Sequence, residues 1–288
     1  LISTLEAYFL GKKELFEGLA MEKLEKDWTT YPIFHIDLNT EKYDTRESLD
    51  SILNFTLEKW EQQYGTAPSE TTFALRFRGL IERAYEQTGH RVVILIDEYD
   101  KPMLQAIGNE ELQKEFRNTM KAFYSVLKTM DGCIQFAFLT GVTKFGKVSV
   151  FSDLNNLDDI SMRKQYVDLC GVSEKELHDN LEIELHELAD AKDLTYGELC
   201  NRLREYYDGY HFTHNSIGIY NPFSLLNAFK YKEFGSYWFE TGTPTYLVKL
   251  LKKHHYDLER MAHEETDAQV LNLSLIHISE PTRRTPIS

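Results

Sequence analysis

The sequence predicts an α/β fold in which helices flank a parallel sheet and a mostly helical region follows. The first observation is that Val92–Ile96 consists of five consecutive aliphatic residues. A strand that is apolar at every position must be covered on both faces, which favours a parallel sheet flanked by helices. Another is the alternation of apolar strands, at 32–38, 92–97 and 133–139, with helical patterns, which indicates right-handed crossovers between parallel strands. After about residue 172 the spacing of apolar residues becomes mostly helical.

Helix signals lie before, between and after these strands. Apolar residues recur at helical spacing over residues 1–9, and Gly11 follows as a candidate stop. Amphipathic patterns predict helices over about 46–64 and 69–88. Asn109 is a candidate N-cap for a helix that carries a row of apolar residues on one face: Leu112, Phe116, Met120, Phe123, Tyr124 and Leu127. These helices are the predicted flanks of the sheet.

The later part of the chain carries its own helix starts. Ser173–Glu176 is a capping box, a second helix is expected over about 195–207, and Asn221-Pro222 is an N-cap followed by proline at the first helical position. A helical region of this size predicts a lid that closes over a nucleotide, although a plain helical domain explains the same pattern.

Composition predicts a globular protein without a membrane segment. Hydrophobic residues make up 42% of the chain, and no apolar stretch is long enough to span a bilayer. The three cysteines are odd in number and far apart, which disfavours a disulfide framework and favours a reducing, cytoplasmic location. The formal charge of −14 opposes binding to a phosphate backbone through the body of the chain.

The acidic pair Asp97-Glu98 follows the most apolar strand directly. Ligands of parallel sheets bind beyond the carboxyl ends of the strands, which is where this pair would lie. That is the layout of a Walker B segment in P-loop NTPases of the AAA/ASCE type: the first acid holds hydrated Mg²⁺, and the second orients and deprotonates the attacking water. A buried strand that simply ends in solvated acids is the alternative.

A phosphate-binding loop, G-x-x-x-x-G-K-[ST], does not precede this strand. Residues 141–148 match it except at Val148, which has no hydroxyl for a metal, and a loop rather than a helix is expected to follow. Because the helical pattern at the start of the chain has no N-cap before it, we expect that a strand and a phosphate-binding loop belong upstream of residue 1. Residues 273–288 read like a translated sequencing adapter and are not expected to be native.

Further candidates for the nucleotide site follow the third strand. Thr140 at its end is a candidate sensor of the γ-phosphate, with Thr143 and Lys144 next to it; a plain strand-to-loop turn is the alternative. Arg163 is a candidate arginine finger or lid sensor, or else a solvated arginine. Asn221 and Pro222 are candidates for a lid turn near adenine, or else a well-capped core helix.

Eight motifs, taken together, resemble the bacterial AAA-ATPase-like family over about residues 1–255. They are Leu5-Glu-Ala-Tyr-Phe9, Leu15-Phe-Glu-Gly-Leu19, Leu95-Ile-Asp-Glu-Tyr-Asp-Lys-Pro102, Thr140-Gly-Val-Thr-Lys-Phe145, Phe151-Ser-Asp-Leu-Asn155, Tyr207-Asp-Gly-Tyr-His-Phe212, Tyr220-Asn-Pro-Phe-Ser224 and Tyr237-Trp-Phe-Glu-Thr-Gly-Thr-Pro244. The resemblance implies a phosphate-binding loop just before the first helix, and it assigns the Walker B roles to Asp97 and Glu98.

The resemblance also implies a division of the chain and a function. Residues 1–172 would be an NTPase core without its phosphate-binding loop, 173–272 a helical lid, and 273–288 the adapter-derived tail. In its intact form such a protein would bind ATP with Mg²⁺ and hydrolyse it. The alternative is a non-catalytic, nucleotide-gated interaction module. Many members carry a C-terminal PD-(D/E)XK nuclease-like domain, so nucleic acid would be a partner only through such a domain. A homo-oligomer is compatible with the resemblance, which leaves the oligomeric state open.

Overall fold

A computed structural model describes residues 1–141, 150–151, 154, 156–161, 163–210 and 217–237. The described residues form two compact units, one that ends at Leu157 and one that begins at Asp158. The expected boundary at residue 172 therefore lies inside the second unit. Thr143 and Lys144 lie outside the described residues. Most of the segment 141–148 and the whole of the tail 273–288 also lie outside them.

The first unit is built on a parallel sheet. Its strands are β1 (Ile33–Asp37), β2 (Val92–Asp97) and β3 (Ile134–Leu139), in the order β1-β2-β3. Both pairings are parallel, and the register places Asp37 opposite Asp97 and Ile96 opposite Leu139. The predicted parallel sheet is confirmed. Val92–Ile96 is fully buried because β2 is the central strand and both faces of the sheet are covered by helices.

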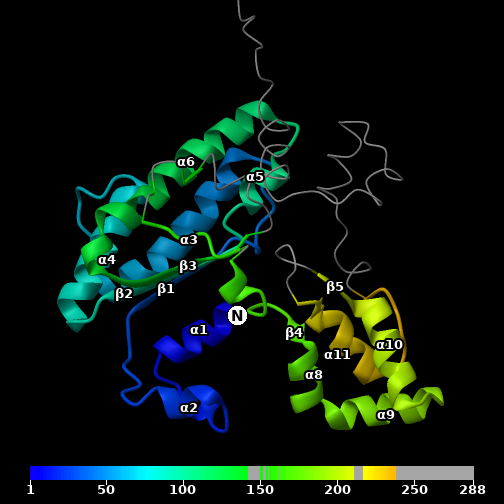
Figure 1. The fold of residues 1–288 in the computed structure, drawn as a ribbon. Coiled ribbons are helices and arrows are strands. Elements are labelled where there is room, and N and C mark those ends of the chain that lie inside the picture. Colours follow the sequence, from blue (N-terminus) through cyan, green and yellow to red (C-terminus); the bar gives the residue numbers. More distant parts are fainter. Residues whose placement is uncertain (142–149, 152–153, 155, 162, 211–216, 238–288) are drawn as a thin grey trace, which may run out of the picture. The chain divides into compact units, whose positions relative to one another are not determined.

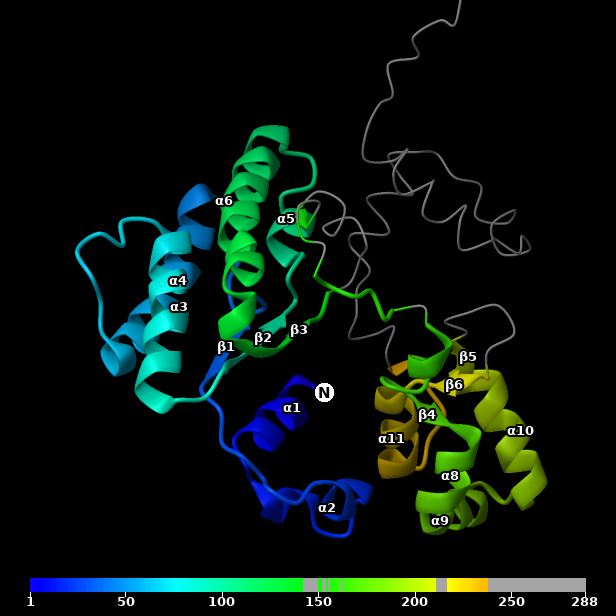
Figure 2. The same ribbon diagram turned by 60° about the vertical axis from the view of Figure 1, so that its left-hand side comes forward.

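Helices cover both faces of this sheet, as Figures 1 and 2 show. On one face α3 (Arg46–Tyr64), α4 (Phe73–Thr88) and α6 (Glu110–Thr129) form the main core with the side chains of Phe34, Ile36, Ile94 and Ile96. On the other face α1 (Ile2–Phe9) packs Ile2 against Val93 and Leu95. The shorter elements η1 (Lys13–Phe16), α2 (Ala20–Leu24), α5 (Lys101–Gln105) and η2 (Asp131–Cys133) connect these parts.

Local sequence signals explain where the flanking helices begin and end. The side chain of Asn109 accepts a hydrogen bond from Leu112 N, so the predicted N-cap of α6 is confirmed. The helix expected from 69 begins instead at Phe73, because the side chain of Thr72 caps it by accepting from Leu75 N. Gly89 ends the same helix in the left-handed conformation, with φ 69°.

The second unit is mostly helical, with a small sheet. Its elements are η3 (Lys164–Tyr166), β4 (Val172–Ser173), α8 (Glu174–Asn180), α9 (Glu182–Lys192), α10 (Tyr196–Tyr207), β5 (Asp208–Tyr210), β6 (Ile219–Tyr220) and α11 (Pro222–Tyr231). The capping box of Ser173 and Glu176 forms as predicted. The antiparallel sheet β4-β6-β5 is not among the predictions, because strands of two or three residues are too short to show a period of two.

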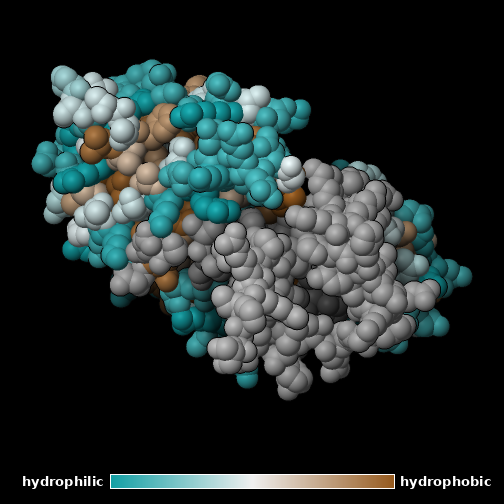
Figure 3. All heavy atoms as spheres, turned by 90° about the horizontal axis from the view of Figure 1, so that it is seen from above, coloured by the Kyte–Doolittle hydropathy of each residue, from teal (hydrophilic) through white to brown (hydrophobic). Residues whose placement is uncertain are grey.

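One face of the described residues is mainly hydrophilic. Figure 3 shows one face, on which hydrophilic residues cover most of the coloured area and hydrophobic ones form smaller areas between them. None of the described helices has both the length and the apolar character that crossing a bilayer requires.

Candidate functional site

Three polar residues meet at one edge of the first unit's sheet. Asp37 ends β1, Asp97 ends β2 and Thr140 follows β3 directly. Because the strands are parallel, their carboxyl ends share an edge, which is where such sheets bind ligands. Backbone hydrogen bonds continue past the strands, from Leu38 N to Asp97 O at 3.1 Å and from Thr140 N to Ile96 O at 2.9 Å. The strand ends are therefore held at fixed relative positions.

Thr140 contacts both residues of the acidic pair. Its hydroxyl donates a hydrogen bond to Asp97 Oδ1 and accepts one from the backbone N–H of Glu98, with an N–O distance of 3.4 Å. The structure thus brings the sensor candidate and the two Walker B candidates into one group. Because the hydroxyl has a single proton, the donation to Asp97 orients that carboxylate and leaves Thr140 only its lone pairs for another partner.

Glu98 has an uncommon backbone conformation. Its φ is 56°, in the left-handed region that residues with a Cβ seldom adopt, and such outliers cluster at functional sites. Two backbone hydrogen bonds hold the turn, one from Tyr99 N to Thr140 O at 2.8 Å and one from Lys101 N to Glu98 O at 3.0 Å. The chain therefore bends sharply between the two acids of the pair, and the bend is tied to the end of β3.

The environment of Glu98 makes it a stronger base than an ordinary glutamate. Burial raises the pKa of its carboxyl, and the negative charges of Asp100, Asp97 and Asp37 raise it further, while Lys101 opposes them. A carboxyl with a raised pKa holds a proton more readily near neutral pH, which suits a general base. The shift also marks this edge as a candidate site on physical grounds.

Two neighbours complete the turn that carries Glu98. The side chain of Asp100 is fully buried, and the ring of Tyr99 lies 4.9 Å from that of Phe151, centroid to centroid. A Cβ at Gly141 would lie 2.6 Å from a ring carbon of Tyr99 and 2.7 Å from Asp100 Oδ1. The chain after β3 approaches the turn so closely that only glycine fits. Sequence reasoning missed Asp100 and Gly141 as site residues; their position beside Glu98 and Thr140 was the available signal.

Lys101 places a positive charge next to the acids. Its ammonium group donates to the side chain of Asn39 and to Asn39 O, the latter at 3.3 Å. The loop after β1 is thereby joined to the first residue of α5. Asp37 Oδ1 accepts from Asn39 N at 2.7 Å, which fixes the third acid of this edge.

The remaining candidates lie in the second unit. The guanidinium of Arg163 forms an ion pair with Asp158 and donates to Asp159 O at 3.2 Å, and half of its side chain is exposed. Asn221 caps α11 by accepting from Ser224 N at 2.9 Å, and Pro222 is the first residue of that helix. These contacts explain the local structure of all three residues. Their roles toward a nucleotide stay predictions.

The acids at the strand ends fit a magnesium ion that is held mainly by other ligands. The described part of the chain contains no group of three or more His, Cys, Asp or Glu side chains that could hold a metal ion by themselves. Mg²⁺ in nucleotide sites uses one or two carboxylates and completes its shell with water and phosphate oxygens. Asp97, with one carboxylate oxygen oriented by Thr140, is a donor of that kind.

Two comparisons relate the chain to known proteins. The model of a family described as "Predicted AAA-ATPase" matches residues 1–151, the part that contains Asp97, Glu98 and Thr140. An "Uncharacterized protein in vnfD 5'region" of Azotobacter chroococcum mcd 1 is 39% identical over 251 residues, which are 87% of this chain and 46% of that protein. The chain thus spans about half the length of this relative. No solved structure matches the chain.

Proposed function

Because the chain belongs to the predicted AAA-ATPase family, we propose that its first unit is part of an ATPase that binds and hydrolyses ATP with Mg²⁺. The observation that carries the proposal is the contact between the ends of β2 and β3, where the Thr140 hydroxyl donates to Asp97 next to Glu98. A buried strand that ended in solvated acids would not need this arrangement, since water would satisfy both carboxylates.

In this proposal the acids have different tasks. Asp97 holds the metal through water, with its carboxylate oriented by Thr140. Glu98 accepts the proton of the attacking water, for which its raised pKa is suited. Bound Mg²⁺ would neutralise charge on the β- and γ-phosphates. The phosphates themselves would need the backbone N–H groups and the lysine of a phosphate-binding loop.

Thr140 then acts mainly as a positioning residue. Its proton is given to Asp97, so its effect on the γ-phosphate would pass through the metal ligand. Residues 173–272 are proposed as a lid over the nucleotide, with Asn221 and Pro222 at the start of α11 near adenine. Arg163 is proposed as the residue that would leave its pair with Asp158 to meet the phosphates.

The test uses a form of the protein that carries a complete phosphate-binding loop. Glu98→Gln keeps the size and polarity of the side chain but removes the base. We expect ATP to bind nearly as before and turnover to fall by roughly 10²–10⁴-fold, the usual contribution of a positioned acid-base group. Asp97→Ala should instead weaken Mg²⁺-dependent binding of ATP, because the metal loses its protein ligand.

Glu61→Gln is the control for the loss of one carboxylate elsewhere in the first unit. Glu61 pairs with Arg76 between α3 and α4, away from the acidic pair. The turnover of this variant should therefore stay close to the wild-type rate. Turnover of Glu98→Gln at the wild-type rate would contradict the catalytic assignment. A nucleotide-gated interaction module, which binds ATP without needing Glu98, would then be the better explanation.

A further inference from the structure

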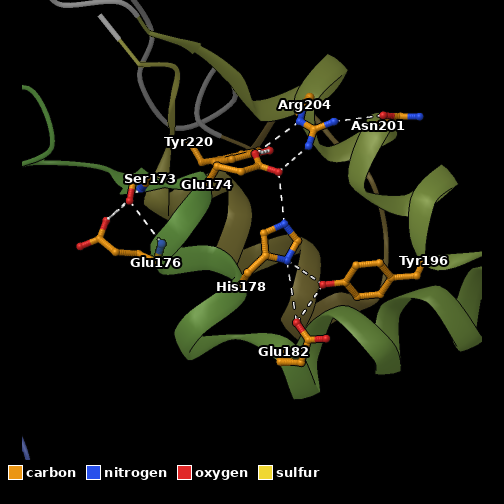
Figure 4. A network of polar contacts seen from close by, with 9 residues as sticks. All are labelled: Ser173, Glu174, Glu176, His178, Glu182, Tyr196, Asn201, Arg204 and Tyr220. Atoms are coloured by element: carbon orange, nitrogen blue, oxygen red, sulfur yellow. Dashed lines mark hydrogen bonds and ion pairs between the residues drawn. The ribbon is translucent and has the colours of Figure 1, made fainter.

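A network of polar side chains in the second unit has His178 at its centre (Figure 4). The imidazole lies between two acceptors from different elements. Its Nε2 is 3.2 Å from Glu174 Oε1 on α8, and its Nδ1 is 2.7 Å from Tyr196 Oη at the start of α10. Glu182 Oε2, at the start of α9, is 3.8 Å from the same Nδ1. One ring therefore touches three helices.

Counting protons shows which form of the ring these contacts favour. Tyr196 has one hydroxyl proton and donates it to Glu182 Oε2 at 2.8 Å, so its oxygen offers Nδ1 a lone pair. Glu174 offers Nε2 a carboxylate oxygen. Both ring nitrogens must then be donors, and only the imidazolium has two N–H groups. A neutral ring leaves one nitrogen lone pair facing an oxygen, or takes the Tyr196 proton away from Glu182.

The neighbouring groups keep both oxygens in their accepting role. Burial opposes the ionisation of Glu174, but hydrogen bonds from Arg204, at 2.6 Å, and Tyr220, at 2.5 Å, outweigh it and lower the pKa of that carboxyl. Burial and the bond to Glu182 raise the pKa of Tyr196 to about 12, so the phenol keeps its proton. The ring thus faces an ionised carboxylate on one side and a neutral hydroxyl on the other.

Charge around the ring also favours the imidazolium. The carboxylates of Glu174 and Glu182 outnumber the one guanidinium of Arg204, and the buried thiol of Cys200 beside Tyr196 adds no positive charge. His178 lies in the last turn of α8, where the helix favours a cation. Among the described residues, His186 on α9 competes with His178 for the carboxylate of Glu182, because its Nε2 lies 3.3 Å from Glu182 Oε1.

We propose that His178 is a proton-dependent link that joins α8 to the starts of α9 and α10, and that loss of its proton loosens this part of the second unit near neutral pH. Histidine is the residue whose charge changes in that range. The protonated ring donates to Glu174 and Tyr196 at once. With a neutral ring the three contacts share only two protons, so either a ring contact or the bond from Tyr196 to Glu182 is lost, and the helices are joined less firmly.

Amide hydrogen exchange of the full chain tests the link. Protection of peptides within 174–207, corrected for the intrinsic exchange rate, is compared between about pH 8 and pH 5.5, where imidazoles titrate and carboxylates stay ionised. We expect protection to rise by about twofold to fivefold as the pH falls, the size of effect that a partly exposed ion pair gives. Peptides of α3 and α4 in the first unit should show no such rise.

Two substitutions test whether the imidazole of His178 causes the pH dependence of amide protection. His178→Gln keeps a hydrogen-bonding side chain without a charge, so protection should be lower and independent of pH. His186→Gln removes the competing histidine and should keep the pH dependence. The proposal is overturned if wild-type protection does not change with pH, or if His178→Gln keeps the wild-type change.

A second measurement does not depend on how the variants fold. Ring ¹⁵N shifts of the wild-type chain report whether each imidazole carries one proton or two. The doubly protonated fraction of the His178 ring should fall over the same pH interval in which the protection of peptides within 174–207 falls. Protection that changes while the His178 ring keeps its protonation state would refute the link.

Discussion

At the scale of single residues, the turn at Glu98 combines three constraints. Glu98 has a positive φ, Asp100 is fully buried, and Gly141 has no room for a side chain. Each of these costs free energy that a plain strand-to-loop turn would avoid. Their concentration beside Asp97 supports a site in which the geometry of two carboxylates is controlled.

Gly141→Ala should destabilise the first unit. The added Cβ would meet the ring of Tyr99 and the carboxylate of Asp100, both buried, so one of them must move. We expect a loss of about 1–3 kcal/mol, the usual cost of overpacking, seen as a melting temperature lower by several degrees. Gly132→Ala is the matched control, because nothing lies within 4 Å of the Cβ it would add. Equal melting temperatures of the two variants would show that the turn adapts freely.

The carboxyl of Glu98 should titrate above the ordinary glutamate value of 4.5, since burial and the charges of Asp100 and Asp97 oppose its ionisation. The folded state then binds this proton more tightly than the unfolded chain does. The resulting stabilisation is full below the unfolded pKa and is lost as the pH rises through the folded pKa. Carboxyl ¹³C shifts of labelled glutamate, assigned with Glu98→Gln, measure the titration.

Asp100→Asn provides the internal check on that titration. It keeps the buried side chain's size and removes one of the charges that raise the pKa of Glu98. The midpoint should therefore move to lower pH. A midpoint unchanged by this substitution would mean that the charge of Asp100 does not contribute to the raised pKa of Glu98.

At the scale of elements, N-cap residues decide where the helices that pack on the sheet begin. Asn109 starts α6, whose apolar face packs Leu112, Phe116 and Met120 into the main core. Asn109→Ala removes the acceptor for Leu112 N and should cost about 1 kcal/mol, while Asn109→Asp keeps an acceptor and should cost little. Urea denaturation of the first unit measures both changes; equal losses would mean that the cap bond contributes nothing to stability.

At the scale of the whole molecule, the acids at the sheet edge would provide only part of the proposed nucleotide site. The sequence contains no complete G-x-x-x-x-G-K-[ST] motif, and such a loop makes most contacts to the phosphates. The chain as written should therefore bind ATP weakly or not at all by calorimetry. Micromolar affinity would mean that residues 141–149 form a phosphate-binding loop, and its loss in Lys147→Ala would confirm that assignment.

The sequence by itself determined the strands of the parallel sheet, several helix starts and the edge at which the acids lie. Val92–Ile96 predicted a buried strand, and Asn109 and Ser173 marked helix starts, because apolar periodicity and caps are local properties of the chain. Position after a strand also placed Asp97 and Thr140 at one edge of a parallel sheet.

Only the tertiary structure decided which of those side chains touch. The bond between Thr140 and Asp97 joins residues 43 positions apart, and it requires both the register of β2 with β3 and the left-handed turn at Glu98. The link from His178 to Tyr196 likewise needs α8 packed beside α10. Register and packing follow from contacts across the whole core, so no local pattern in the sequence specifies them.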